Sequence, residues 1–242
     1  MRQIVHWGAA RESRYVCICN VHSVVTTTGD PAFRNVINGA DMATPDGAPI
    51  AWALRRFGFA AQERINGPDL MWRYLEQAER LGQQPFFYGS SHDTLRKLRD
   101  AVAWRFPRLQ VAGTCSPPFR PLSASEDEAQ VEMINQSGAH VVFVGLGCPK
   151  QETWMAAHRG RIHAVMIGVG AAFDYHAGTL KRAPLWWQRH GLEWLYRLGS
   201  DPRRLLRRYM VTNTLFIIGF SRQLVLRKFL ERFASRCTDD AG

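Results

Sequence analysis

The 242-residue chain lacks several patterns that would point directly to a familiar chemistry. Its five cysteines form no CxxC pair and have no neighbouring histidine pattern, which argues against a zinc site and favours reduced, structural thiols. No complete GxGxxG or P-loop pattern is present, and no Asp-X-Asp pair is available to hold a divalent cation. No apolar run reaches the roughly 18 residues that a membrane-spanning helix needs. The first ten residues also contain no long apolar run, so we expect no secretory signal there.

Acidic residues are scarce in the C-terminal quarter of the chain. The net charge is +10, and residues 180–242 hold 13 Lys and Arg against 5 Asp and Glu, whereas residues 1–179 are nearly balanced. Such asymmetry points to an anionic partner, either a nucleic acid or a membrane surface. With 46% hydrophobic residues the rest of the chain can bury a substantial core. We therefore expect two parts, residues 1–179 as a folded core and residues 180–242 as a basic appendage.

Short apolar runs alternate with segments of helical periodicity through the first two thirds of the chain. Residues 15–25 form an apolar entry segment. We expect strands at 85–88, 109–114, 140–145 and 163–168, and helices at 51–57, 68–81, 94–106, 126–137 and 151–158. Residues 41–50 contain proline and glycine and are expected to form a loop. This order predicts an α/β fold, a Rossmann-like parallel sheet flanked by helices on both faces.

Ligands of such sheets bind beyond the carboxyl ends of the strands, so the glycine-containing loops there are candidates. Gly89 ends one strand and opens a helix, where backbone N–H groups suit a phosphate, although an ordinary capped turn fits equally well. Gly145 and Gly147 allow close backbone approach, and the helical turn that follows Pro149 would face a bound nucleotide with its first three residues, Lys150, Gln151 and Glu152.

Three further loops present acidic side chains. Asp174 follows a glycine-rich turn at Gly170 and would hold ribose hydroxyls or cap a turn. Asp46 lies between Pro45 and Gly47 in a tight turn, a position that presents a side chain but that is usually only a turn. Asp69, in the first turn of a helix, most simply complements the helix dipole.

The C-terminal quarter joins an aromatic segment, 191–198, to a dense arginine array. Arginines spaced three and four residues apart stack on one helix face and suit phosphate oxygens. Residues 215–233 then alternate large apolar and basic side chains, which predicts an amphipathic helix. Such a helix lies in the headgroup region of a membrane, or else it packs on the core or on an oligomer interface.

An ordered set of short motifs resembles the WecG/TagA/CpsF family of glycosyltransferases over roughly residues 15–210. The motifs are Thr44-Pro45-Asp46-Gly47, segments 64–70, 145–152 and 168–170, Phe173-Asp174, Ala177-Gly178, and segments 181–184 and 191–198. The resemblance implies a metal-independent, inverting transfer of a sugar from a UDP-sugar to a polyprenyl-diphosphate-linked sugar in surface polysaccharide biosynthesis. No cofactor is expected.

The resemblance also implies roles for particular residues. Asp46 corresponds to the general base that takes a proton from the acceptor hydroxyl. Arg197, Arg204 and Arg207 correspond to arginines that contact the lipid diphosphate. From the loops above and from the resemblance together, the positions expected to bind substrate are Asn20, Thr44, Arg64, Asn66, Asp69, Gly89, Gly145, Gly147, Lys150, Gln151, Glu152, Gly170 and Asp174. Ile18 stands where the family usually has threonine.

On this reading the protein is cytoplasmic and peripheral on the inner face of the cell membrane. Its partners would be the UDP-sugar, the polyprenyl-diphosphate sugar and an anionic membrane surface, with no nucleic acid; a homo-oligomer stays open. The donated sugar is also open among N-acetylmannosamine, its uronic acid, glucose and another hexose. A nucleotide-binding oxidoreductase is disfavoured because no GxGxxG with a downstream acidic partner exists. A nucleic-acid-binding module is disfavoured because the tail cations alternate with large aliphatic residues.

Overall fold

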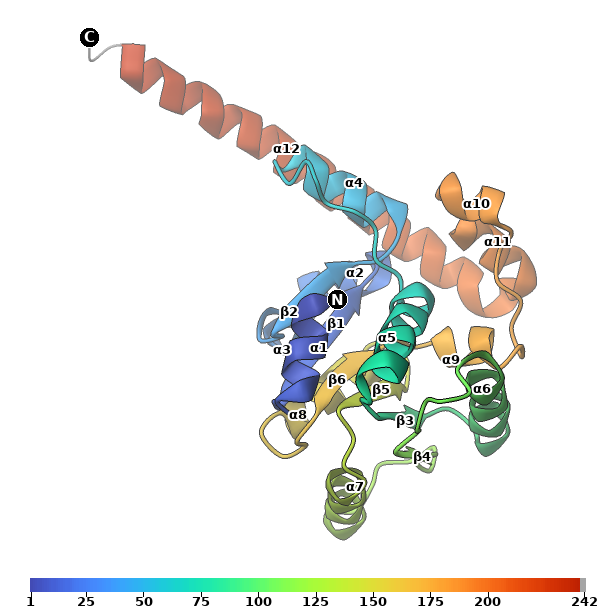
Figure 1. Cartoon of the computed structure of the whole chain (residues 1–242). Helices are drawn as coiled ribbons and strands as arrows, with labels where there is room; N and C mark the ends of the chain where they lie inside the picture. Colours follow the sequence, from blue (N-terminus) through green and yellow to red (C-terminus); the bar gives the residue numbers. More distant parts are fainter. Residues whose placement is uncertain (240–242) are drawn as a thin grey trace.

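A computed structural model describes the backbone of residues 1–239, and the side chains of residues 1–229 apart from Arg204 and Lys228. Its centre is a six-stranded, wholly parallel sheet in the spatial order β2-β1-β6-β5-β3-β4. The strands are β1 Arg14–Cys19, β2 Met42–Pro45, β3 Pro85–Gly89, β4 Gly113–Cys115, β5 Val141–Gly145 and β6 Val165–Gly168. The expected Rossmann-like parallel sheet flanked by helices is confirmed (Figure 1).

Helices cover both faces of the sheet, because alternate residues of each central strand point to opposite sides. Val16 and Phe143 belong to the core on one face, and Cys17 and Val142 to the core on the other. The first face is covered by α1 Arg2–Ala9, α5 Gly67–Leu81, α6 His92–Arg105 and α9 Ala172–His176. The second face is covered by α2 Val21–Gly29, α3 Pro31–Asn38, α7 Ala124–Gln136 and α8 Lys150–His158.

The chain leaves neighbouring strands β3 and β5 toward opposite faces. β3 continues into α6 on one side of the sheet, whereas β5 continues into α8 on the other. Where adjacent strands diverge in this way, their outgoing loops separate and leave a crevice at the carboxyl edge. β6 likewise continues into α9 on the first face, while its neighbours β1 and β5 continue into helices on the second, so the topology provides ligand-binding positions along the carboxyl edge from β1 to β3.

Local sequence signals explain where the helices of the site begin. Asn20 caps α2 by accepting the backbone N–H of Ser23 at 3.1 Å. Asn66 caps α5 in the same way, accepting from the N–H of Asp69 at 2.9 Å, and Pro68 follows in the first turn. Side chains of this type satisfy donors that have no partner inside the helix. Both caps fix the positions of residues expected to bind substrate.

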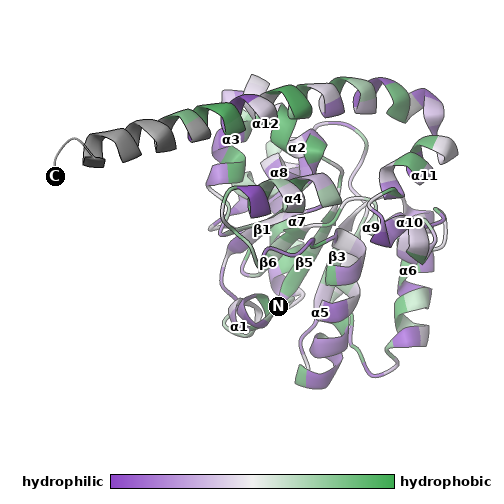
Figure 2. Ribbon diagram, turned by 90° about the horizontal axis from the view of Figure 1, so that it is seen from above, coloured by the Kyte–Doolittle hydropathy of each residue, from purple (hydrophilic) through white to green (hydrophobic). Residues whose placement is uncertain are grey.

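The C-terminal quarter is helical: α10 Leu185–Arg189, α11 Glu193–Ser200 and the long α12 Pro202–Asp239. α12 crosses α2, with which it packs, and runs along α4 Ala48–Arg56 (Figures 1 and 2). Phe220 packs against α4 and the residue that follows it: the centre of its ring lies 5.0 Å from that of Trp52 and 5.5 Å from that of Phe57. In the described part of the chain, no helix is long and apolar enough to cross a membrane.

Three sequence expectations about elements were wrong. Residues 41–50 are not a loop throughout, since β2 occupies Met42–Pro45 and α4 begins at Ala48. The strand expected at 109–114 covers only Gly113–Cys115, and the tail helix begins at Pro202 rather than near residue 215. α1 was not expected at all. Short edge strands such as β2 and β4 depend on pairing with a neighbour, a tertiary effect that local patterns do not reveal.

Candidate active site

The loops after β1 and β2 bring the first candidate residues together. The two strands pair in parallel with Cys19 opposite Pro45, so Asn20 and Asp46 follow adjacent strand ends. The backbone N–H of Asp46 donates to the carbonyl of Cys19 at 2.8 Å, which extends the ladder by one residue and fixes the turn. Thr44, two residues before Asp46, is buried. Asp46 is thus held at the carboxyl edge of the sheet, where ligands of this fold class bind.

The Asp46 carboxyl group lies in a partly desolvated position, with its side chain 27% exposed. Burial raises its pKa to about 6, against the opposing influence of Arg64; Glu193 adds to the increase, and the Gly47 N–H and Arg197 lower it. A carboxyl group with such a pKa is ionised near neutral pH yet remains basic enough to accept a proton. This is the protonation behaviour that a general base requires.

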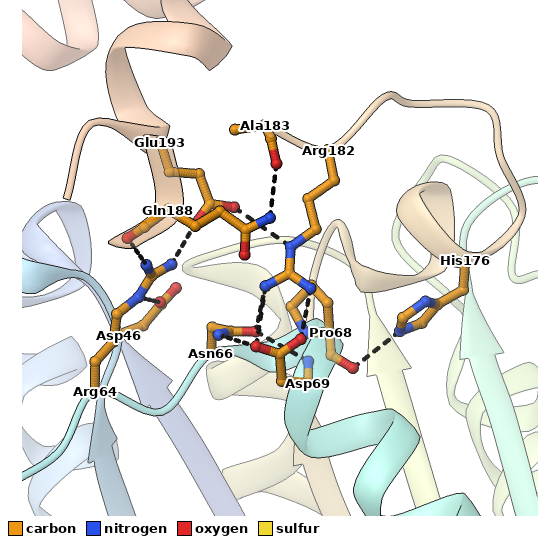
Figure 3. A network of polar contacts seen from close by, with 10 residues as sticks. All are labelled: Asp46, Arg64, Asn66, Pro68, Asp69, His176, Arg182, Ala183, Gln188 and Glu193. Atoms are coloured by element: carbon orange, nitrogen blue, oxygen red, sulfur yellow. Dashed lines mark hydrogen bonds and ion pairs between the residues drawn. The ribbon is translucent and has the colours of Figure 1, made fainter. Parts of the chain in front are cut away.

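Arg64 connects Asp46 to the C-terminal helices (Figure 3). Its Nε lies 3.6 Å from Asp46 Oδ1, its Nη2 makes a short ion pair with Glu193, and its Nη1 reaches the carbonyl of Gln188 at 3.5 Å. The side chain is 22% exposed. One guanidinium therefore links the turn after β2 to both α10 and α11.

Arg182 makes the second connection between the core and the C-terminal segment (Figure 3). Its guanidinium binds both carboxylate oxygens of Asp69, at 2.5 and 3.0 Å, and also donates to Asn66 Oδ1 at 3.2 Å. This fork lowers the pKa of Asp69, whose carboxylate also accepts from the Asn66 amide at 2.7 Å. Glu193 lies within 3.8 Å of Arg182 Nε and so stands between the two arginines.

Arg197 on α11 lies near the same group of charged residues. Its guanidinium sits 5.8 Å from the centre of the Tyr175 ring. Burial raises the pKa of both Tyr175 and Asp46, and the charge of Arg197 opposes that increase. The Tyr175 hydroxyl is buried without a hydrogen-bond partner among the described residues. Together the three arginines, at 64, 182 and 197, face three carboxylates, at 46, 69 and 193, so this part of the site is close to electrically neutral while Asp46 is ionised.

Gly89 and Gly145 are the last residues of the neighbouring strands β3 and β5 and pair with each other in the sheet. Gly89 has φ +114°, and a Cβ on it would lie 2.7 Å from the backbone of Gly145. A Cβ on Gly145 would in turn lie 2.7 Å from the Phe173 ring. Only glycine permits this approach of the two loops. These two positions, both expected to bind the nucleotide, therefore lie side by side at the carboxyl edge of the sheet.

Gln151 and Glu152 are buried at the start of α8 rather than displayed on its surface. The Gln151 amide accepts from the N–H of Gly170 at 3.0 Å and donates to Glu152 at 2.9 Å. Burial raises the pKa of Glu152, and its Oε2 has no hydrogen-bond partner among the described residues. Gln151 thus ties the loop after β5 to the loop after β6.

Other expected residues lie farther from this cluster. Lys150 is exposed at the first position of α8, and Arg207 is exposed on α12. Asp174 lies in α9, where Thr179 donates to its backbone carbonyl at 3.1 Å. Gly147 has φ +81° in the turn before α8. The side chain of Arg204 lies outside the described residues.

Sequence reasoning missed several residues of the site, among them Arg182 and Glu193. Both fall within motifs that supported the resemblance, at 181–184 and 191–198, but neither was singled out. Arg208 was missed as well: its Nε is buried without a partner in the described part of the chain, and its charge adds to the burial that lowers the pKa of His22. Helical spacing alone does not reveal which arginine of a dense array turns toward the core.

No group of three or more His, Cys, Asp and Glu side chains that could hold a metal ion occurs among the residues that the structure describes. The negative charge of a bound diphosphate would meet guanidinium groups and backbone N–H donors here. That the transfer needs no metal stays a prediction from the family resemblance.

A parallel sheet that presents Asp46 and several arginines beyond its carboxyl edge is typical of α/β enzymes, which bind their ligands at that edge. Comparison with known proteins makes this specific, because the profile of the glycosyl transferase WecG/TagA/CpsF family matches residues 1–229. The chain belongs to this family, as its motifs indicated.

A relative from Bacillus spizizenii is 33% identical over 176 residues, which cover 72% of this chain and 66% of the relative. That protein is named an N-acetylglucosaminyldiphosphoundecaprenol N-acetyl-beta-D-mannosaminyltransferase. The match thus spans slightly less than two thirds of the relative's length.

Proposed function

We propose that this protein is an inverting glycosyltransferase that moves a sugar from a UDP-sugar to a polyprenyl-diphosphate-linked sugar during surface polysaccharide biosynthesis. The observation that carries the proposal is the Asp46 carboxyl group, with its pKa of about 6, at the carboxyl edge of the sheet beside Arg64 and Arg197. Family membership supports the transfer of a sugar, and the relative's name supports a diphosphate-linked lipid acceptor. An N-acetylmannosamine-type donor is the first to test.

In this reaction Asp46 takes the proton of the acceptor hydroxyl while the hydroxyl oxygen attacks the anomeric carbon of the donor. A new C–O bond forms on the face opposite the leaving group, and the bond to UDP breaks with its electron pair on the diphosphate. Protonation of Asp46 leaves the surrounding arginines with one uncompensated positive charge. That charge appears as negative charge develops on the leaving diphosphate, which stabilises the transition state.

The nucleotide would occupy the crevice between the loops after β3 and β5, and the acceptor would approach Asp46 from the side of α11 and α12. α12 offers a surface for an anionic membrane, since apolar side chains such as Met210, Ile217 and Ile218 are exposed between arginines. Peripheral attachment at the inner face of the cell membrane follows from this proposal. No specific observation favours the oxidoreductase or the nucleic-acid-binding alternative.

Release of UDP from a panel of UDP-sugars tests the proposal. The acceptor is a short-chain polyprenyl-diphosphate N-acetylglucosamine, and wild type is compared with Asp46→Asn, which keeps the size of the side chain but removes the base. We expect acceptor-dependent release with at least one donor and a loss of about 100-fold or more in Asp46→Asn. Equal rates in the two proteins would exclude Asp46 as the base, and no release with any donor, combined with no UDP binding by calorimetry, would exclude the transferase itself.

A further inference from the structure

Glu193 occupies an unusual place for an acidic residue in a protein whose ligands are expected to be anionic. It begins α11, its side chain is only 15% exposed, and it lies between the guanidinium groups of Arg64 and Arg182 (Figure 3). A carboxylate there competes with any anionic ligand for the same arginines. The arrangement therefore suggests that Glu193 serves another group of the site.

The other group is identified by the directions in which Arg64 uses its donors. Its two Nη nitrogens are directed to Glu193 and to the Gln188 carbonyl, both in the C-terminal segment. Only Nε faces Asp46, at 3.6 Å, and it is buried without a hydrogen-bond partner among the described residues. An unconstrained arginine beside a carboxylate would form two parallel hydrogen bonds of about 2.8 Å. Arg64 does not form that pairing, since its Nε is 3.6 Å from Asp46 Oδ1 and its Nη nitrogens point elsewhere.

A closed pair would impair Asp46 as a base, because both carboxylate oxygens would be occupied by the guanidinium. We propose that Glu193 is a positioning residue that holds Arg64 back from Asp46 and so leaves an Asp46 oxygen available for the acceptor proton. This inference rests on the proposed function and extends it. It makes α11 part of the proton-transfer apparatus, so the base is competent only while the segment after residue 180 is docked on the core.

Among the residues that the structure describes, charged or titratable groups face Asp46 from several of the elements packed around it. They are Arg64 from the segment before α5, Glu193 and Arg197 from α11, and the Cys19 thiol from β1. Arg64 and Arg197 favour the ionised carboxylate, whereas Glu193 opposes it. Removing the charge of Glu193 should lower the pKa of Asp46 for two reasons. It withdraws a negative neighbour, and it releases Arg64 to pair with Asp46.

The test is a direct titration of Asp46 by NMR in protein labelled with 13C at the aspartate carboxyl carbons, with Asp46→Asn used to assign the signal. In Glu193→Gln, which keeps the shape of the side chain, we expect the pKa of Asp46 to fall by about 1 unit or more from its wild-type value of about 6. In Glu193→Asp, which keeps the charge, the pKa should return toward the wild-type value.

Two comparisons separate positioning from other effects. Asp93→Asn removes a negative charge from an ion-paired carboxylate on α6, outside the site, so it should leave the Asp46 titration in place. In an Arg64→Gln background, Glu193→Gln should have a much smaller effect, because the residue that it controls is gone. An unchanged Asp46 titration in Glu193→Gln, an equal shift in Asp93→Asn, or an equal shift without Arg64 would each overturn the proposal.

Kinetics add a readout that a purely structural role would not produce. In Glu193→Gln the acidic limb of the rate profile should move to lower pH together with the NMR titration, with kcat reduced more than KM is raised. A shifted titration in a protein that transfers no sugar would leave the positioning role standing and would refute the proposed function instead.

Discussion

At the scale of single residues, Asp46 is governed by two opposing influences. Burial favours the neutral acid, while Arg64 and Arg197 favour the carboxylate, and the balance raises the pKa to about 6. A base must be ionised to act, so its useful form is lost as pH falls through that value.

We therefore predict that the rate of UDP release rises with pH through about 6 and is level above it. Initial rates at saturating substrate across this range check the prediction. Asp46→Glu serves as the comparison, because it keeps a carboxyl group but moves it by one methylene group, so it should retain a pH dependence at a reduced rate. A profile that stays level well below pH 6 would show that another group accepts the proton.

The contact between Gly89 and Gly145 carries a second prediction at this scale. Gly89→Ala would place a methyl group 2.7 Å from the backbone of Gly145 in addition to straining a residue at φ +114°. We expect a loss of unfolding free energy of about 1–3 kcal/mol and weaker UDP binding, measured by denaturant unfolding and calorimetry.

Gly82→Ala is the matched control. Gly82 also has a positive φ, +68°, but no atom lies within 4 Å of a Cβ placed there. Its cost should be confined to backbone strain of about 1 kcal/mol, and UDP binding should not change. Equal effects of the two substitutions on UDP binding would mean that the approach of the two loops does not matter for the nucleotide.

Asp46, Arg64, Asn66 and Asp69 could be named from the sequence because proline, glycine and capping side chains mark their loops, and because the motifs resemble a family. Glu193 could not be given its place, since its partners Arg64 and Arg182 lie in segments that only the fold brings together. Local patterns identify which residues are presented at a loop, but not which of them pair.

At the scale of elements, α9 is joined to the start of α5 through His176. The imidazole stacks on Trp72, with ring centres 3.7 Å apart, and donates from Nε2 to the carbonyl of Pro68 at 3.0 Å. Burial lowers the pKa of His176 to about 4. The contact helps to place α5, and with it Asn66 and Asp69, relative to the loop after β6.

This contact makes stability depend on pH. The folded state resists protonation of His176 whereas the unfolded chain accepts a proton near pH 6.5, so its contribution is complete above pH 6.5 and is lost as pH falls toward about 4. We predict that the difference in unfolding free energy between wild type and His176→Gln narrows over this range, by on the order of 3 kcal/mol at most. Urea unfolding at several pH values measures it, and a constant difference would contradict the assignment.

The long central elements could be predicted because each carries its own signal. In α5 the buried residues Leu70, Met71, Tyr74, Leu75 and Ala78 follow helical spacing between an Asn cap and a left-handed glycine. β2 has only four residues, and its register comes from pairing with β1. The start of α12 was missed because its first turns are dominated by arginine, although Leu205 there is buried on the core.

At the scale of the whole molecule, the appendage expected at residues 180–242 shares polar contacts and packing with the core. Arg182 and Glu193 join the site by ion pairs, and Leu205, Thr212 and Phe220 bury one side of α12. α12 also exposes apolar side chains, and much of its middle part is coloured hydrophobic in Figure 2. The exposed apolar residues are Leu206, Met210, Val211, Leu215, Ile217, Ile218, Val225, Leu226 and Phe229. Because arginines accompany this apolar surface, we propose an anionic bilayer as its partner.

The last prediction tests this surface without removing the helix. Ile217 and Ile218 are 62% and 60% exposed, so replacing both with glutamate should leave the fold intact while it removes apolar contact and adds repulsion from anionic lipid. Losing the burial of these two isoleucine side chains in the bilayer should by itself cost about 3 kcal/mol of membrane-binding free energy, or roughly 100-fold in affinity. Co-sedimentation with phosphatidylglycerol vesicles, with phosphatidylcholine vesicles for comparison, measures the loss.

Trp104→Glu is the matched control, because Trp104 is 85% exposed on α6, an element of the sheet's flank and not of α12. It should sediment with vesicles as wild type does. The double variant should still release UDP from the donor when the acceptor is short and water-soluble, since Asp46 and its arginines are untouched, and it should fail with a long-chain acceptor embedded in vesicles. Undiminished sedimentation of the double variant would show that this face of α12 does not bind the membrane. A second copy of the chain would then be the partner to test, by measuring whether the molecular mass in solution rises with protein concentration.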